Sequence, residues 1–187
     1  HMESEKYLIA VGIATTFLTV IFWSFGFLRM GTVGLISQAL GKADYRETVY
    51  IILRNIFIAI FISFLIILLK PLLLHFINQI FTTSIQTKVL IDEYISIRVF
   101  SAPAELIAYV LVGFYLGIQK TFVSSLLIII SSTLNIILSV YFVRELNLNV
   151  TGVALGTLVA FYITIIIFSI YTYFFILKRF KVIPRFN

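Results

Sequence analysis

Residues 7–28 read YLIAVGIATTFLTVIFWSFGFL, a run without a charged side chain that is long enough to cross a lipid bilayer as a helix. Arg29 interrupts this run and residues 30–41 are again uncharged, so we expect one long helix over 7–41 that extends past the bilayer. Residues 75–93 are more polar and predict a surface connection, with at most a short interfacial helix. Similar apolar stretches predict further spans at residues 48–74, 94–119, 121–143 and 150–177. The sequence therefore predicts an all-α, polytopic membrane bundle of about five transmembrane helices, with residues 1–187 as a single bundle.

The composition is that of a chain whose solvent is mostly lipid. Hydrophobic residues make up 61% of the chain and charged residues only 12%, whereas soluble domains are about a quarter charged. The net charge of +6 comes from basic residues scattered among apolar runs, which argues against a nucleic-acid partner. Without cysteine, and with His1 and His75 far apart, no metal site is expected. No phosphate-binding loop or nucleophile elbow occurs, so we expect no enzyme.

The distribution of basic residues predicts the orientation in the membrane. If the first span runs from outside to inside, the cytoplasmic ends carry the larger group, Lys42, Arg46, Arg54, Lys120, Lys178, Arg179, Lys181 and Arg185. The outer ends then carry Lys6, Lys70, Lys88 and Arg144. By the positive-inside rule, we expect the N-terminus outside and the C-terminus in the cytoplasm.

Two pairs of glycines have the spacing of close helix contacts in membranes. Gly113 and Gly117 end the third predicted span, and Gly152 and Gly156 begin the fifth. Such small-residue pairs let two helix backbones approach closely. An equally good interpretation is that glycine is simply tolerated near the ends of helices.

Residues 25–41 read FGFLRMGTVGLISQALG, and this stretch carries a family resemblance. It closely resembles the second-helix signature of the multidrug and toxic compound extrusion (MATE) family, in particular its DinF-like branch, which is written FLRMGTTGLTAQA. The matching positions that we single out are Arg29, Gly31, Thr32, Gly34 and Gln38.

Three further stretches are similar to later helices of the same family. Residues 98–117 (RVFSAPAELIAYVLVGFYLG), with Pro103, resemble the fourth helix, residues 135–138 (NIIL) the fifth, and residues 150–155 (VTGVAL) the sixth. The resemblance implies that the chain corresponds to helices two to six of the N-terminal lobe of a twelve-helix fold. The opening HMESEKYL resembles the segment that follows the first helix. We therefore expect an incomplete lobe that lacks the first helix and the C-terminal lobe.

The family resemblance implies a secondary active multidrug antiporter in a bacterial inner membrane. Such a protein exports organic cations and other amphipathic compounds by alternating access, with a proton or sodium as coupling ion and no cofactor. The implied partners are the bilayer, a drug-like substrate and, as one option, a separate chain that carries the missing helix and lobe.

The resemblance also implies positions for a cation site. Bacterial members join an Asp of the first helix to an Asn and an Asp of the fifth and a Thr of the sixth. Motif by motif, the Asn matches Asn135 and the Thr matches Thr157, while Ser139 stands at the position of the fifth-helix Asp. Both acids are therefore missing. The alternative for these three residues is purely structural, as hydrogen bonds to a neighbouring helix or to their own helix.

Glu105 is the acid that lies deepest in a predicted span, so we consider it as a substitute proton or cation site in the cleft. The alternative is an ion pair with Arg98, two helical turns away on the same face. For Arg29, near the expected cytoplasmic interface, snorkelling to the headgroups is the interpretation that we favour.

Other functions remain open from the sequence. A degenerate, non-transporting remnant or a small membrane assembly subunit would have the same spans. A lipid-linked-precursor flippase of the same superfamily is a closer alternative, and the DinF-like signature argues against it.

Overall fold

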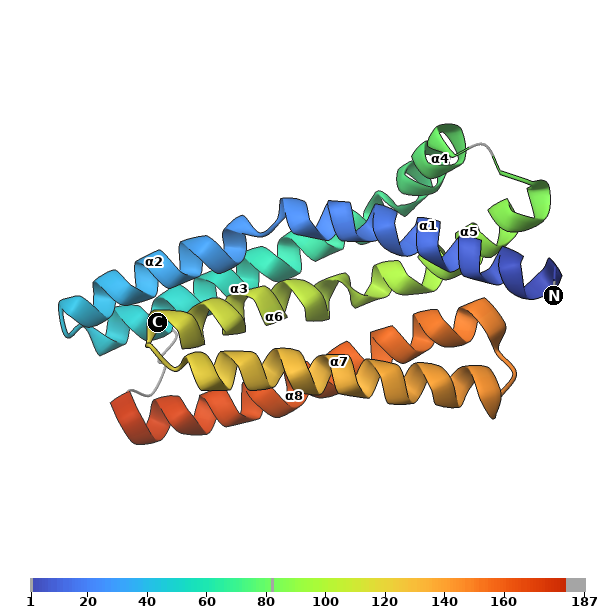
Figure 1. Ribbon diagram of the computed structural model, residues 1–187. Helices are drawn as coiled ribbons and strands as arrows, with labels where there is room; N and C mark the ends of the chain where they lie inside the picture. The colour runs from blue at the N-terminus through green and yellow to red at the C-terminus, as the bar shows by residue number, and fades with distance from the viewer. Residues whose placement is uncertain (1, 82, 181–187) are drawn as a thin grey trace.

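The computed structural model of the protein describes residues 2–81 and 83–180, and these residues fold almost entirely into helices (Figure 1). In chain order they are α1 (Met2–Ser24), α2 (Phe27–Gly41), α3 (Tyr45–Leu68), α4 (Lys70–Ile80), α5 (Ile85–Arg98), η1 (Val99–Ser101), α6 (Ala102–Gly117), α7 (Thr121–Arg144) and α8 (Asn149–Phe180). Over these residues the structure contains no strand, which confirms the all-α class.

Five helical stretches of the described chain are long and apolar enough to cross a membrane. They are Lys6–Gly41, Tyr45–Leu68, Ile85–Gly117, Thr121–Arg144 and Asn149–Ile176. Each carries enough consecutive apolar residues for the hydrocarbon core of a bilayer. The predicted polytopic membrane bundle is thus confirmed.

The first span differs from the single helix that the sequence predicts. It is divided at Phe25 and Gly26, where backbone N–H groups bond three residues back, to Phe22 at 3.0 Å and Trp23 at 2.9 Å. These tighter turns break the α-helical bonding pattern and separate α1 from α2.

The connection between the second and third spans also differs from the prediction. α3 ends at Leu68, six residues short of the predicted 74, and Pro71 stands in the first turn of α4, where proline fits a helix start. The third span begins at Ile85 instead of 94, because Ser84 caps α5 by accepting a hydrogen bond from the Thr87 N–H at 3.3 Å. Residues 75–93 are therefore largely helical.

The spans run back and forth along one axis. In Figure 1, α1 and α2 run from right to left, α3 returns, α5 and α6 run left again, and α7 and α8 form a hairpin below them. α4 projects from the bundle near the end where α1 begins. The beginning of α1 and the end of α8 therefore lie at opposite ends of the bundle.

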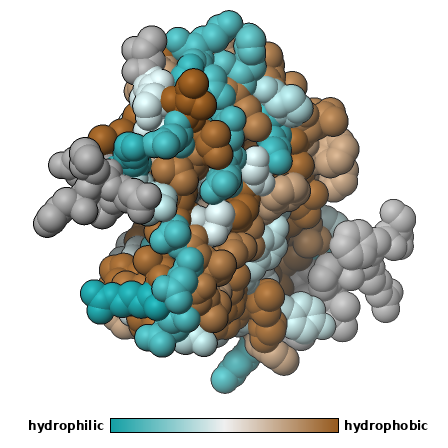
Figure 2. Space-filling view, turned by 90° about the vertical axis from the view of Figure 1, so that its right-hand side faces the viewer, coloured by the Kyte–Doolittle hydropathy of each residue, from teal (hydrophilic) through white to brown (hydrophobic). Residues whose placement is uncertain are grey.

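The α5–α6 segment is the centre of this bundle. It contacts α1, α2, α3, α7 and α8. In the most apolar 18-residue stretch of this segment 72% is buried, whereas the corresponding stretch of α7 is only 11% buried. Aromatic side chains such as Trp23, Phe57 and Phe64 point outward from the flanks. Figure 2 looks onto the end where α1 begins and shows hydrophilic residues gathered there among apolar ones. This arrangement suits a bundle with apolar sides and polar ends.

The four glycines singled out in the sequence lie where two helices touch, and three of them leave no room for a Cβ atom. A Cβ atom on Gly113 would be 2.6 Å from the Arg29 carbonyl oxygen, and one on Gly117 would be 2.7 Å from the Ile36 side chain. On Gly156 it would be 2.5–2.6 Å from Ser139. The close-packing interpretation therefore holds for the α2–α6 and α7–α8 contacts. A Cβ atom on Gly152 would be 3.1 Å from the Phe142 backbone of α7, a less severe but still tight contact.

The signature positions of α2 divide into two groups. Thr32 is fully buried and accepts a hydrogen bond from the Asn55 amide of α3 at 2.8 Å, so it joins two helices. A Cβ atom added to Gly31 or Gly34 would have no neighbour within 4 Å, and Gln38 is exposed. The signature therefore contributes both to the core and to an outward face of α2.

Candidate functional site

A cavity of about 390 Å³ lies between α1, α5, α7 and α8. Its wall is polar for a membrane bundle and consists of Thr15, Tyr94, Arg98, Ser131, Ser132, Asn135, Ile136, Val153, Thr157 and Phe161. Hydroxyl, amide and guanidinium groups inside a membrane bundle are costly unless they have partners or serve a ligand. This cavity is the candidate functional site.

Asn135 and Thr157 meet across the α7–α8 contact, inside this cavity. The Asn135 amide donates a hydrogen bond to the Thr157 hydroxyl at 2.7 Å, and that hydroxyl lies 3.0 Å from the Val153 carbonyl oxygen. Two residues that the sequence matched to the family's cation site are therefore side by side. The bond also fits the structural alternative, because it ties two helices together.

Ser139 does not line the cavity. It lies one turn further along α7, where it packs against Gly156. Its hydroxyl oxygen is buried and has no hydrogen-bond partner among the described atoms. The third candidate of the cation site is thus placed beside the cavity and not in its wall.

Glu105 forms an ion pair with Arg98, the alternative that the sequence left open, and is not among the residues that line the cavity. Both side chains are nearly buried, with 8% of Glu105 and 11% of Arg98 exposed. The Ser101 hydroxyl accepts a hydrogen bond from Arg98 and lies 3.3 Å from the Glu105 carboxylate. In the sequence, the η1 turn and Pro103, at the start of α6, separate the two charged residues.

Aromatic rings enclose the Arg98 guanidinium. Its central carbon lies 5.5 Å from the centroid of Phe22 on α1 and 5.6 Å from that of Phe161 on α8. Such cation–π contacts, together with the Glu105 carboxylate, stabilise a cation that has left water. Arg98 therefore faces the cavity with its charge already matched.

Sequence reasoning missed Thr15 and Tyr94, whose hydroxyl groups are hydrogen bonded at 3.0 Å and connect α1 to α5 at the cavity wall. It also missed Ser131 and Ser132. The sequence around a serine, threonine or tyrosine in an apolar run does not indicate which face of the helix carries the hydroxyl group. No local signal could therefore have identified these four residues.

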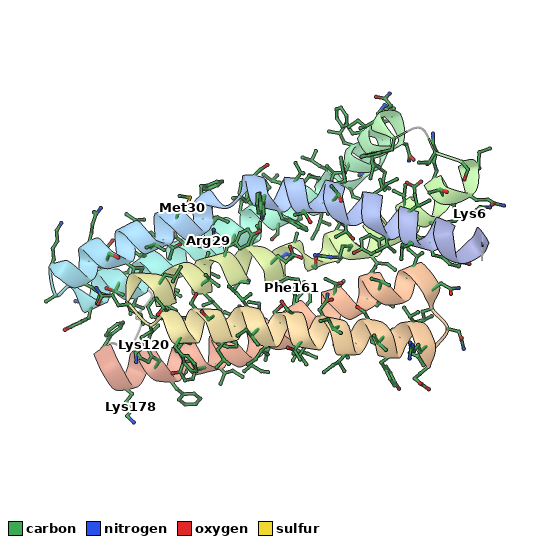
Figure 3. All side chains as sticks on the ribbon, in the orientation of Figure 1. Lys6, Arg29, Met30, Lys120, Phe161 and Lys178 are labelled. Atoms are coloured by element: carbon green, nitrogen blue, oxygen red, sulfur yellow. The ribbon has the colours of Figure 1, made fainter. Side chains whose placement is uncertain are left out.

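A second cavity, of about 240 Å³, adjoins the first. Its wall consists of Arg29, Ala108, Tyr109, Val112, Leu127, Ile128, Ser131, Ser132 and Phe161, and the last three residues belong to both cavities. Figure 3 shows Arg29 and Phe161 toward the middle of the bundle, whereas Lys6 and Lys178 lie at its two ends. The exposed Arg29 side chain lines this second cavity beside residues of α7, and snorkelling of Arg29 to the headgroups stays a prediction.

A five-span helical bundle with a polar cavity between its helices defines the class of the chain as a polytopic membrane protein. The MatE family model matches residues 1–141, and the chain belongs to this family. The resemblance seen in the α2 signature is thereby confirmed.

Curated relatives agree with this assignment. The chain is 33% identical over 167 residues to DNA damage-inducible protein F of Escherichia coli K12, a match that covers 89% of the chain and 36% of that protein. It is 25% identical over 170 residues to Multidrug export protein MepA of Staphylococcus aureus strain bovine RF122 / ET3-1, covering 91% of the chain and 38% of that protein. The chain thus spans little more than a third of the length of these relatives.

Solved structures share the fold. An outward-facing multidrug resistance MATE family transporter of the MOP superfamily matches with a TM-score of 0.79 at 22% identity, over 88% of this chain and 37% of that one. An inward-facing transporter of the same description matches with a TM-score of 0.76 at 19% identity, over 90% and 42%. The helices are therefore arranged like the matched part of these two structures.

Proposed function

We propose that this chain is part of a secondary active multidrug exporter and works with further helices, in the same or another polypeptide, by alternating access. The observation that carries the proposal is the Asn135–Thr157 pair in the wall of a mid-bundle cavity, in a chain of the MatE family. Transporters of this kind bind their substrates in cavities between helices near the bilayer midplane. The relatives named multidrug export proteins support a drug-like substrate.

Organic cations and other amphipathic compounds are the proposed substrates, and a proton or sodium is the proposed coupling ion. For a proton, the Arg98–Glu105 pair supplies a coupling mechanism. While Glu105 is ionised, it cancels the charge that Arg98 brings to the cavity wall. A proton on Glu105 removes that compensation, so the cavity becomes positive and repels an organic cation. Proton uptake and cation release would then be linked at one site.

The orientation stays a proposal, with the beginning of α1 outside and the end of α8 in the cytoplasm. It is supported by the basic residues, because Lys42 and Lys120 lie at the end of the bundle opposite to Lys6 and Arg144. The chain has no cysteine, so the labelling of a single introduced cysteine can be measured without background from other thiols of the chain. In intact cells, we expect a membrane-impermeant maleimide to label Arg144→Cys and to spare Lys42→Cys until the cells are permeabilised. The opposite pattern would invert the orientation.

Drug efflux in a pump-deficient bacterial strain tests the function. The full chain is expressed alone and together with the region of E. coli DNA damage-inducible protein F that lies outside the matched residues, and drug resistance is measured. We expect resistance only from co-expression, and we expect Asn135→Ala to abolish it while the chain still inserts in the membrane.

Two outcomes would contradict the proposal. If the inserted chain gives no resistance in either setting, the remnant or assembly-subunit interpretation replaces transport. If co-expression gives resistance that Asn135→Ala leaves unchanged, the cavity is not the substrate path. Proton coupling at Glu105 is tested separately. Because Glu105→Gln is uncharged at every pH and leaves the cavity positive, it should abolish efflux of organic cations by the assembled transporter across the pH range, and efflux that still responds to pH would exclude that role.

A further inference from the structure

The two adjoining cavities beside α7 carry more positive than negative charge between them. They share Ser131, Ser132 and Phe161 in their walls. Arg29 lines one cavity and Arg98 the other. No Asp or Glu lines either cavity within the described chain. Glu105 does not line either cavity, but its ion pair with Arg98 compensates the charge of that residue. One of the two positive charges therefore has no ion-pair partner among the described residues.

That remaining charge belongs to Arg29. Over residues 2–81 and 83–180, the ion pairs are Glu47–Arg54 and Glu105–Arg98, and neither includes Arg29. A guanidinium within a membrane span is expensive and normally has an anionic partner or a water-filled surrounding. The Arg29 side chain is exposed and lines the second cavity. Among the described residues, Arg29 is therefore a cation without an anion.

The groups around Arg29 suit an oxyanion attached to an apolar tail. The Tyr109 phenol and the Ser131 and Ser132 hydroxyl groups line the same cavity and can donate hydrogen bonds to oxygen. Leu127 and Ile128 of α7 make the rest of that wall apolar. A guanidinium binds phosphate through two parallel N–H donors, which fixes the geometry as well as the charge.

We propose that the cavity lined by Arg29, Tyr109, Ser131 and Ser132 binds the phosphate group of an amphipathic ligand, with the ligand's apolar part along Leu127 and Ile128. Basic pockets between transmembrane helices bind anionic headgroups by the same chemistry. An acidic phospholipid and a soluble phosphate both offer this group. The site is independent of the proposed transport, because it requires only the folded chain and can be tested by binding alone.

The test measures ligand-induced thermal stabilisation of the full chain, purified in a neutral detergent. The probes are dihexanoyl phosphatidylglycerol, dihexanoyl phosphatidylcholine and inorganic phosphate. We expect phosphatidylglycerol to raise the melting temperature at concentrations where phosphatidylcholine does not. Arg29→Gln should weaken its apparent affinity by about tenfold or more, because a hydrogen-bonded charge is lost. Arg144→Gln, which removes an equal charge from the exposed end of α7, should leave the affinity unchanged.

Two more variants separate binding from folding. Arg29→Lys keeps the charge without the paired donors and should retain part of the affinity. Tyr109→Phe keeps the ring and should weaken binding without changing any charge. Stabilisation by the lipid alone assigns the site to headgroups, and equal, Arg29-dependent stabilisation by inorganic phosphate assigns it to soluble phosphates. The proposal is overturned if Arg29→Gln keeps the full preference for phosphatidylglycerol, or if the native chain shows none.

Discussion

Replacing Glu105 with glutamine will lower the free energy of unfolding by about 3–5 kcal/mol, because it leaves the Arg98 guanidinium without its counter-charge inside the bundle. Only 11% of the Arg98 side chain is exposed, so water replaces little of the lost carboxylate. The glutamine carbonyl can still accept a hydrogen bond from Arg98. The Phe22 and Phe161 rings contact Arg98 in the native chain and in the variant alike, so they do not change this difference.

The effect should be unequal between the two partners. Arg98→Gln leaves a carboxyl group that can take up a proton and become neutral, whereas arginine cannot lose its charge. We therefore expect Arg98→Gln to destabilise less than Glu105→Gln. In the double variant no unpaired charge remains, so it should be more stable than Glu105→Gln alone.

The chain contains a matched control for this experiment. Glu47 and Arg54 on α3 also form an ion pair, but 44% and 62% of their side chains are exposed. Glu47→Gln should cost at most about 1 kcal/mol, because exposed pairs contribute little. Unfolding in mixed micelles with increasing denaturing detergent gives all four values. If Glu105→Gln is no worse than Glu47→Gln, the buried pair does not hold α5 and α6 together.

The fold was predictable because the bilayer imposes one length scale on every span. Apolar runs marked the five spans, and the glycine spacing marked two helix contacts, α2–α6 and α7–α8. The break at Phe25–Gly26 was not predictable, since it contains no proline and lies within an uncharged run. The early start of α5 did have a signal. Buried Thr87, Ile91 and Tyr94 recur at helical spacing after the Ser84 cap, although polar residues between them lower the local hydropathy.

The candidate site was predictable only in part. Asn135 and Thr157 were found through a motif, and the Arg98–Glu105 pair followed from helical spacing as one of two alternatives. The surroundings of Arg29 depend on which faces of α2, α6 and α7 meet, and no property of the sequence near Arg29 contains that information. For this reason the sequence alone did not indicate that Arg29 lines a cavity.

Gly156→Ala will destabilise the bundle by about 1–3 kcal/mol, a cost typical of overpacking in a core that has no room to adjust. The added methyl group would lie 2.6 Å from the backbone nitrogen and Cα of Ser139, and backbone atoms within α7 cannot move aside as a side chain can. α7 and α8 must then separate at this level, which also strains the Asn135–Thr157 hydrogen bond one residue further along α8.

Gly12→Ala is the matched control for that change, since Gly12 lies within α1 and has nothing within 4 Å of the added carbon. Alanine is favoured over glycine inside a helix by up to about 1 kcal/mol, so this variant should be neutral or slightly more stable. The same micelle unfolding experiment compares the two. If both variants behave alike, the α7–α8 contact tolerates a wider spacing, and the position of Thr157 in the cavity wall does not depend on the glycine. If they differ as expected, the glycine spacing near the start of α8 sets the distance at which the two candidate residues meet.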